Sequence, residues 1–311
     1  MMNGVRASID LGSNSILLLI AEVSNGVFKE IEKDAEVTAL GKELDKNKEF
    51  IQESMDATFS VLKSYAERCD KHGVKREEIV ATATEAARTA KNARAYFDKV
   101  EKELGIKVKI ITSEAEAYFS SKGILFDTNF ESEVITIMDI GGASTELINV
   151  NTKNFQILSS ISMPIGAVRS TQWLKDSLFV QNLQKVFLDF RMQLDKFQTK
   201  ELYCVAGTVT SLGNMHLERK EFIEDDVHGL KMKVEDIDKL FKNYASTTPE
   251  AFLEEFPFLG KRSQSILGGL HLVYHLIHRL MTKELTISTY GLRYGTILEG
   301  SIKEEYLSKN T

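Results

Sequence analysis

Two short segments of the chain repeat one design, in which an aspartate near the end of an apolar run precedes a turn of small residues. They are Asp10-Leu11-Gly12-Ser13-Asn14-Ser15 and Asp139-Ile140-Gly141-Gly142-Ala143-Ser144-Thr145-Glu146. Glycine, serine and asparagine allow successive backbone amides to point at one anion, which suits a phosphate group. An aspartate beside such a turn can bind Mg²⁺, because hard cations take oxygen ligands. The repeat therefore predicts two phosphate-binding turns, at residues 12–15 and 141–145.

A single turn of this kind would favour a plain hairpin in which the aspartate forms an Asx turn. Two copies in matching strand–turn–strand contexts favour phosphate binding. A third loop, Ala206-Gly207-Thr208-Val209-Thr210-Ser211, follows a predicted strand and opens a predicted helix. The free amides at a helix N-terminus suit another phosphate at Gly207 and Thr208. An ordinary strand-to-helix turn remains the alternative for this loop.

The elements that carry these turns alternate between strands and helices, which indicates a layered α/β fold. In the first half we expect strands at 5–9, 16–23, 27–31, 79–82 and 108–111, and helices at 49–71, at 84–104 and from 113. In the second half we expect strands at 134–139, 145–150, 155–162, 201–206 and 285–288. Helices are expected there at 170–177, 180–197, 234–245 and 262–281, with a last helix from 296.

The composition bounds the class of protein. With 311 residues the chain is long enough for two domains. A net charge of −6 argues against binding nucleic acid through a broad basic surface. The longest apolar run, residues 16–21, falls far short of the roughly 20 residues that span a membrane. Cys69 and Cys204 are the only cysteines, so we expect no disulfide framework, no secretory leader and a cytoplasmic location.

Further segments line up, in order along nearly the whole chain, with one known family. Besides the two turns they are Ala83-Thr84-Glu85-Ala86-Ala87-Arg88, Ser113-Glu114-Ala115-Glu116-Ala117, Met163-Pro164-Ile165-Gly166-Ala167-Val168-Arg169, Val227-His228-Gly229, Ile266-Leu267-Gly268-Gly269 and Gly291-Leu292-Arg293-Tyr294-Gly295. Together these segments resemble the exopolyphosphatase / guanosine pentaphosphate phosphohydrolase family in its short, two-domain form.

The resemblance implies two actin-like (ribonuclease H-like) α/β domains with a cleft between them, as in the sugar kinase/Hsp70/actin superfamily. We expect domain I at 1–125 plus 296–311 and domain II at 126–295. The implied activity is removal of a terminal phosphate from inorganic polyphosphate, or of the 5′ γ-phosphate from guanosine pentaphosphate. The implied cofactor is Mg²⁺, with K⁺ left open, and the implied assembly is a homodimer without nucleic-acid or membrane partners.

The resemblance also implies roles for single residues. Glu116 would activate the attacking water, Arg88 would hold a substrate phosphate, and Asp139 would complete the catalytic set. Asp10, Asp139 and Glu146 would bind the metal ion. From the residues alone, Arg88 also fits a surface arginine, and Glu146 an exposed strand residue.

Glu116 has a competing interpretation. Ser113-Glu114-Ala115-Glu116 predicts a capping box, in which Ser113 caps a helix and Glu116 reaches back to a backbone amide. A glutamate fully engaged in capping is a poor base. The resemblance favours the catalytic role for Glu116.

Other candidates stay open or favour packing. Arg293 fits a phosphate contact or an ion pair equally well. His271, His275 and His278 share one helix face, but the apolar residues between them favour a packing helix over a metal site. His228 is expected to shape a loop.

Several positions depart from the family pattern. Leu17 replaces a usual Arg or His, Tyr118 a usual arginine and Thr289 a usual aspartate, while Ala143 and Ala206 replace glycines. Fewer cations should weaken the binding of long polyanions. Two other functions therefore stay open: a catalytically weak protein that binds guanosine tetra- or pentaphosphate, and an ATP-dependent kinase or ATPase of the same superfamily.

Overall fold

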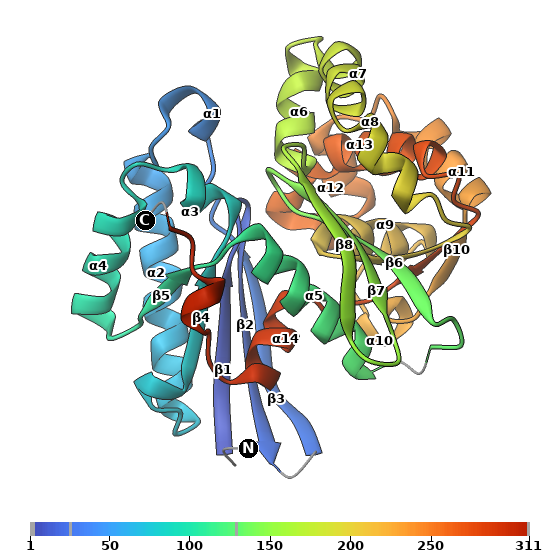
Figure 1. Ribbon diagram of the computed structural model, residues 1–311. Helices are drawn as coiled ribbons and strands as arrows, with labels where there is room; N and C mark the ends of the chain where they lie inside the picture. Colours follow the sequence, from blue (N-terminus) through green and yellow to red (C-terminus); the bar gives the residue numbers. More distant parts are fainter. Residues whose placement is uncertain (1–3, 25–26, 128–129, 310–311) are drawn as a thin grey trace. The chain divides into compact units, whose positions relative to one another are not determined.

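The computed structural model describes residues 4–24, 27–127 and 130–309 (Figure 1). The chain forms two compact units: unit 1 comprises Met1–Asp127 and Gly291–Thr311, and unit 2 comprises Thr128–Tyr290. The sequence places the domain boundaries at 125/126 and 295/296. Residues 291–295 lie in unit 1, because residues 292–295 are the first turn of helix α14, which packs against α5 and β1 of that unit. Among the described residues, no helix combines the length and apolarity that crossing a membrane requires.

The described part of unit 1 contains a five-stranded sheet in the order β3-β2-β1-β4-β5. β1, β2 and β3 pair antiparallel, whereas β1, β4 and β5 run parallel. The strands are β1 Gly4–Leu11, β2 Ser15–Ser24, β3 Val27–Val37, β4 Ile79–Ala83 and β5 Val108–Ile110. The helices are α1 Leu44–Asn47, α2 Gln52–Lys71, η1 Arg76–Glu78, α3 Glu85–Thr89, α4 Ala93–Leu104, α5 Ser113–Asp127, α14 Leu292–Glu299 and η4 Glu304–Tyr306.

Within the described residues of unit 2, six strands form a sheet in the order β10-β11-β9-β6-β7-β8. They are β6 Val134–Ile140, β7 Thr145–Asn151, β8 Gln156–Met163, β9 Glu201–Val205, β10 Lys231–Lys233 and β11 Glu284–Ile287. The helices are α6 Ala167–Lys175, α7 Phe179–Asp189, α8 Arg191–Leu194, η2 Asp195–Phe197, α9 Gly207–His216, α10 Glu224–Val227, α11 Val234–Tyr244, α12 Pro249–Glu255, η3 Pro257–Arg262 and α13 Ser263–Arg279.

The two sheets share one topology. β6, β7 and β8 pair antiparallel like β1, β2 and β3, and β6, β9 and β11 run parallel like β1, β4 and β5. Unit 2 differs by the antiparallel edge strand β10. The repeated turns therefore occupy equivalent places, each joining the central strand of a sheet to its antiparallel neighbour. This duplicated α/β architecture matches the two-domain actin-like fold expected from the sequence.

Side chains along β1 alternate between the two faces of the sheet, and each face packs against different helices. Ala7, Ile9 and Leu11 are buried in the apolar core beneath α2 and α4. Ser8 lies on the opposite face, where its hydroxyl contacts Oγ1 of Thr296 on α14 at 2.7 Å. Helices α5 and α14 cover this second face (Figure 1). Asp10 has the same parity as Ser8, so it falls on the face that α5 and α14 cover.

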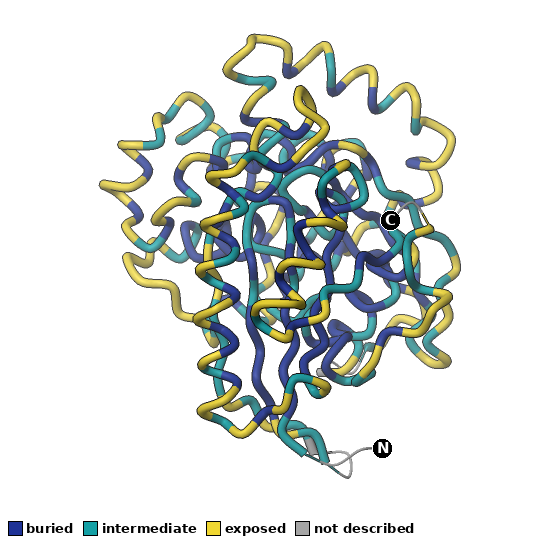
Figure 2. Tube along the Cα trace, turned by 90° about the vertical axis from the view of Figure 1, so that its left-hand side faces the viewer, coloured by how far each residue is buried: buried dark blue, intermediate teal, exposed yellow. Residues whose placement is uncertain are grey.

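The pattern of buried and exposed residues is the same in both units. The strands are mostly buried, whereas many helices expose one side to solvent (Figure 2). Helices α5 and α14 approach closely at two glycines. A side chain at Gly295 would lie 1.9 Å from the carbonyl oxygen of Phe119, and one at Gly123 would lie 2.2 Å from that of Gly291. Larger residues at either glycine would push these helices apart.

Three predicted helices differ from the structure. The segment 84–104, predicted to be mostly helical, contains two helices, α3 and α4. They are separated where the Asn92 side chain pairs with both backbone groups of Phe50, at 2.8 and 3.0 Å. The predicted helix 180–197 divides into α7, α8 and η2. The last helix begins at Leu292 instead of 296, so the segment 291–295 is not a separate loop.

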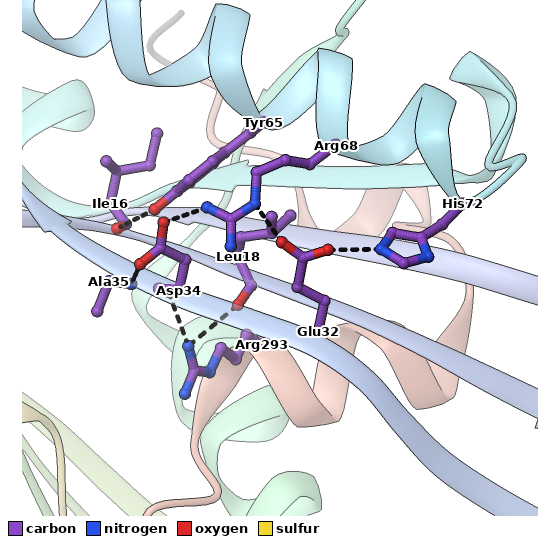
Figure 3. Close-up of polar contacts among 9 residues, drawn as sticks. All are labelled: Ile16, Leu18, Glu32, Asp34, Ala35, Tyr65, Arg68, His72 and Arg293. Carbon is purple, nitrogen blue, oxygen red and sulfur yellow. Dashed lines mark hydrogen bonds and ion pairs between the residues drawn. The ribbon is translucent and has the colours of Figure 1, made fainter.

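A bulge in β3 sends two nearby acids to opposite faces of the sheet. Ile20 pairs with Glu32 and Ala21 with Glu30, which leaves Ile31 as the extra residue. Glu32 contacts Arg68 of α2 and His72, the residue that caps the C-terminus of α2, each at 2.5 Å (Figure 3). Glu30 accepts a hydrogen bond from the Tyr294 hydroxyl of α14 at 2.7 Å. The bulge therefore fastens β3 to both α2 and α14.

Arg293 also fastens α14 to the sheet. Its Nη1 donates to the carbonyl oxygens of Leu18 and Asp34, each at 3.2 Å (Figure 3). Both partners are main-chain groups, so these contacts test neither the phosphate contact nor the ion pair that the sequence left open for Arg293.

Candidate functional site

The parallel strands of unit 1 all end at one edge of its sheet. Asp10 is in register with Thr82 of β4, and Ala83 of β4 is in register with Ile110 of β5. The loops that leave these strands therefore open at the same edge, where α/β proteins commonly bind ligands. They are the first turn, the segment entering α3 and the segment entering α5.

Arg88 and Glu116 meet at this edge. Nη2 of Arg88 donates to Oε2 of Glu116 at 2.9 Å and lies 3.4 Å from a carboxylate oxygen of Glu85. Nη1 of Arg88 donates to the carbonyl oxygen of Ile111 at 2.8 Å. Glu116 is only 8% exposed, so its carboxylate is largely shielded from water. The sheet thus brings together two residues to which the sequence assigned catalysis.

The capping box predicted at Ser113 is wrong. Helix α5 begins at Ser113, so Thr112 is its N-cap, and Oγ1 of Thr112 accepts a hydrogen bond from the amide of Ala115 at 3.1 Å. The amide of Glu116 donates to the carbonyl oxygen of Thr112 at 3.0 Å, as an ordinary helical bond. The Glu116 carboxylate accepts from Arg88, and Thr112 supplies the cap that the sequence placed at Ser113.

The first turn is closed by a bond from the amide of Gly12 to the carbonyl oxygen of Ser15 at 3.0 Å. Its outward carbonyls are held by the segment after β3: Gly41 donates to Ser13 at 2.7 Å, and Ala39 donates to Asn14 at 2.9 Å. Within the described residues, the amides of Ser13 and Asn14 donate to no protein group. Free amides beside immobilised carbonyls are the arrangement that favours an anion.

The second turn repeats this construction. The amide of Gly141 donates to the carbonyl oxygen of Ser144 at 3.0 Å, the same bond that closes the first turn. Here the N-terminus of α6 holds the carbonyls, since Ala167 donates to Gly141 at 2.9 Å and Val168 donates to Gly142 at 2.8 Å. Among the described residues, the amides of Gly142, Ala143 and Ser144 find no acceptor in the protein. The hydroxyl of Thr145 is already used, because it donates to the carbonyl oxygen of Ile165 at 2.6 Å.

The carboxylates proposed to bind metal occupy strand ends. Asp10 and Asp139 are partly exposed, and one residue separates each of them from its turn. Asp139 is in register with Glu146 across β6 and β7, whereas Asp10 faces Leu17 at the equivalent position of β1 and β2. Glu146 is only 2% exposed and accepts a hydrogen bond from the Ser162 hydroxyl at 2.6 Å. Within the described parts of the chain, no group of three or more His, Cys, Asp or Glu side chains is placed to hold a metal ion.

The third loop stands at the start of α9 and has an arginine beside it. Atom Nη2 of Arg262 would lie 2.7 Å from a side chain added at Gly207, and Nη1 donates to the Ser211 hydroxyl at 3.3 Å. No carboxylate in the described structure pairs with this guanidinium, and burial lowers the pKa of Arg262. Ala206, just before α9, has a φ of 78°, a conformation that favours glycine.

Sequence reasoning missed two arginines near the predicted turns. Arg169 donates from Nη1 to the carbonyl oxygen of Ala143 at 2.6 Å, and Arg262 lies against Gly207. Arg169 belongs to the segment 163–169, which carries the family resemblance, so the sequence could have indicated it as a site residue. Arg262 is far from Gly207 in sequence, so only the fold reveals their proximity.

Two departures from the family pattern, Tyr118 and Thr289, have local partners. The Tyr118 ring stacks on Tyr306 with centroids 5.3 Å apart. The amide of Thr289 donates to Nδ1 of His228 at 3.1 Å, and the Thr289 hydroxyl donates to Glu224 at 2.8 Å. His228 therefore shapes a loop, as expected.

The histidines of α13 are packing residues, as predicted. His271 contacts the carbonyl oxygen of Ala245 at 3.0 Å, and its ring packs against Phe179 and Phe241. His278 pairs with Asp238. Burial lowers the pKa of both His271 and His275.

Comparison with known proteins decides the family. The model of the Ppx/GppA phosphatase family matches residues 19–304. The chain belongs to this family. Ppx/GppA membership supports hydrolysis of phosphoanhydrides as the general activity.

Relatives and solved structures agree with this placement. The chain is 30% identical to a bifunctional 3-dehydroquinate synthase/phosphatase of Fusobacterium nucleatum, covering 96% of this chain and 47% of that protein, or about half its length. It is 25% identical to exopolyphosphatase 2 of Mycobacterium tuberculosis, covering 94% of this chain and 97% of that protein. A crystal structure of an exopolyphosphatase from Cytophaga hutchinsonii matches with a TM-score of 0.86 at 25% identity, covering 96% of this chain and 99% of that one. These matches support a Ppx/GppA-type hydrolase with the two-domain α/β fold.

Proposed function

We propose that this protein removes terminal phosphate from inorganic polyphosphate, from the 5′ end of guanosine pentaphosphate, or from both. The observation that carries the proposal is the shielded Arg88–Glu116 pair beside the first turn. Family membership and the similarity to exopolyphosphatases support it.

Glu116 is the proposed general base. A carboxylate can orient a water molecule and take its proton as the water attacks phosphorus. In the structure this carboxylate faces Arg88, whose planar fork is suited to two oxygens at once. A substrate phosphate would compete with Glu116 for that fork. Arg88 would then hold the phosphate while Glu116 is released towards water.

The turns are the proposed stabilisers of phosphoryl charge. Residues 12–15, residues 141–145 and the pair Gly207–Thr208 offer preset backbone amides, which stabilise negative charge with little reorganisation. Arg169 adds a guanidinium beside the second turn, and Arg262 adds one beside the third. The amides and these two cations belong to binding, and Glu116 to water activation.

Ppx/GppA phosphatases generally depend on a divalent metal ion. We propose Mg²⁺, with Asp10, Asp139 and Glu146 as the oxygen ligands. All three carry the hard donors that Mg²⁺ prefers, and neither Asp10 nor Asp139 is buried. When bound, the ion would neutralise charge on the phosphoryl oxygens. Mg²⁺ is usually held by only one or two carboxylates, so the ion would keep several water ligands.

Phosphate release tests the proposal. The wild type and Glu116→Gln are compared on polyphosphate and guanosine pentaphosphate, with and without Mg²⁺ and K⁺. We expect Mg²⁺-dependent release by the wild type and a loss of about 10²- to 10⁴-fold in Glu116→Gln. Glu114→Gln is the matched control, because Glu114 is exposed on the same helical turn. Full activity in Glu116→Gln would remove Glu116 from this role.

The same assay separates the alternatives. A kinase or ATPase of the superfamily would turn over ATP with an acceptor and release no phosphate from polyphosphate alone. A regulatory binder would bind guanosine tetra- or pentaphosphate, with turnover at background in both the wild type and Glu116→Gln. The Fusobacterium nucleatum relative is described as a phosphatase, so phosphate monoesters belong in the substrate panel. We also propose a homodimer, which sedimentation velocity would test.

A further inference from the structure

We propose that the C-terminal segment (residues 302–308) is a positioning element for Arg88 and Glu116, with Tyr306 at its centre. The inference rests on the proposed function, in which these two residues act on phosphate. It concerns how the end of the chain sets their geometry.

The C-terminal segment is hydrogen-bonded to the connection between β5 and α5. Leu307 forms an antiparallel bridge with Ile111. The amide of Thr112 donates to the carbonyl oxygen of Tyr306 at 2.9 Å, and the amide of Ser308 donates to that of Ile110 at 3.0 Å. The C-terminal segment thus adds a short strand beside residues 110–112.

Residues 111 and 112 also set the geometry of the site. The carbonyl oxygen of Ile111 accepts the hydrogen bond from Arg88, and Thr112 caps the helix that carries Glu116. The carbonyl of Ile111 and the amide of Thr112 belong to one peptide group. That group accepts from Arg88 through its oxygen and donates to Tyr306 through its nitrogen. Hydrogen bonds in such a chain polarise one another, so the bond to Tyr306 strengthens the bond to Arg88.

The side chain of Tyr306 packs against α5, the helix that carries Glu116. Its ring stacks on Tyr118, with an interplanar angle of 23°, and meets Phe119 edge-on with centroids 5.3 Å apart. Ile302 is buried in the same cluster, together with Ile111 and Ala115. Tyr118 follows Glu116 by two residues, so the packing constrains the first turns of α5. It also gives a reason for the tyrosine at position 118, where the family resemblance expects an arginine.

Tyr306 acts through other residues, because its described contacts reach the peptide group of residues 111 and 112 and the rings of α5. Loosening the connection would move Glu116 relative to its water and Arg88 relative to phosphate. A general loss of stability would instead lower the fraction of folded protein and leave the turnover of each folded molecule unchanged. Rate constants per folded molecule therefore distinguish positioning from stability.

The test compares Tyr306→Ala and a chain ending at Lys303 with two controls. Tyr306→Phe keeps the stacked ring, and a chain ending at Ser308 keeps every contact of the C-terminal segment named above. Phosphate release gives kcat and KM across pH, and thermal melting gives the folded fraction. Hydrogen exchange reports on the amides of residues 110–118.

We expect Tyr306→Ala to lower kcat by about 10- to 100-fold, as for a catalytic group displaced by about 1 Å. Tyr306→Phe and the chain ending at Ser308 should stay within about twofold of the wild type. Amides at 112–116 should exchange faster in Tyr306→Ala and in the chain ending at Lys303, because the connection opens locally. A folded Tyr306→Ala protein with normal kcat would overturn the proposal, as would unchanged exchange. If the wild type released no phosphate, the proposed function would fail, and exchange alone would still decide the positioning role.

Discussion

Nη2 of Arg88 lies 2.9 Å from Oε2 of Glu116, although the two residues belong to helices that follow different strands. β4 and β5 run parallel and in register, which brings the start of α3 beside the start of α5. Both side chains are largely buried, with 15% and 11% of their surfaces exposed. A shielded charge pair of this kind is sensitive to the loss of either partner.

Removing Arg88 alone should therefore destabilise the protein. We expect Arg88→Met to lower the free energy of unfolding by about 2–4 kcal/mol at pH 7, because the shielded Glu116 carboxylate would lose this guanidinium. The double variant Arg88→Met/Glu116→Gln should lose less than the sum of the single losses, with a coupling of about 1–3 kcal/mol. Urea denaturation of the four proteins measures this cycle. Additive losses would show that the pair is not coupled in solution.

The network on β3 should make stability depend on pH. Burial raises the pKa of Glu32, but hydrogen bonds from His72 and Arg68 outweigh burial, so the pKa lies below the ordinary value of 4.5. A lowered carboxyl pKa contributes stability above about pH 4.5 that is lost as the pH falls through the lowered value. Glu32→Gln should cost about 1 kcal/mol at pH 7, and the difference should shrink towards pH 3. Chemical denaturation at both pH values checks this.

Glu36→Gln is the control for that series. Glu36 lies on the same strand and is exposed, so its loss should change stability by less than about 0.5 kcal/mol at either pH. A constant difference between the wild type and Glu32→Gln from pH 7 to pH 3 would contradict the linkage.

Ala206→Gly should stabilise unit 2. Ala206 has a φ of 78°, and glycine adopts positive φ without the clash that a Cβ atom makes. Left-handed backbone costs a residue with a side chain about 1–2 kcal/mol, so we expect a gain of about 1 kcal/mol. Thermal melting measures it. Ala95→Gly, at an exposed site within α4, should lose about 1 kcal/mol instead, and a loss in both variants would argue against strain at residue 206.

Leu17→Arg should strengthen polyphosphate binding. Leu17 stands opposite Asp10, as Glu146 stands opposite Asp139, and the family resemblance expects a cation there. One charge-assisted hydrogen bond to phosphate is worth about 1.5–3 kcal/mol, so KM for polyphosphate should fall by about tenfold or more. Leu17→Gln, which has similar length and no charge, should change KM little. Equal KM values for the two variants would exclude a phosphate contact at this position.

Local sequence signals predicted the parts of the site that local chemistry determines. The Asp–small-residue turns are closed by identical hydrogen bonds, and Gly105 ends α4 in the left-handed conformation with a φ of 68°. The features that the sequence did not predict depend on contacts between residues distant in sequence. Asn92 breaks a helix by pairing with Phe50, and Arg262 reaches Gly207 across the unit. The cap is Thr112 and not Ser113, since β5 ends at Ile110, one residue before the end that the sequence predicted.

The bulge at Ile31 has a consequence for how the chain folds during synthesis. It directs Glu30 to Tyr294, while Arg293 bonds to the backbone of β2 and β3. Unit 1 therefore lacks a covering helix until α14 leaves the ribosome, whereas the contiguous unit 2 is complete earlier. Domains generally fold as units as they emerge. Here the half translated second can reach its native state first, and the sheet of unit 1 must wait for α14 with one face covered by α5 alone.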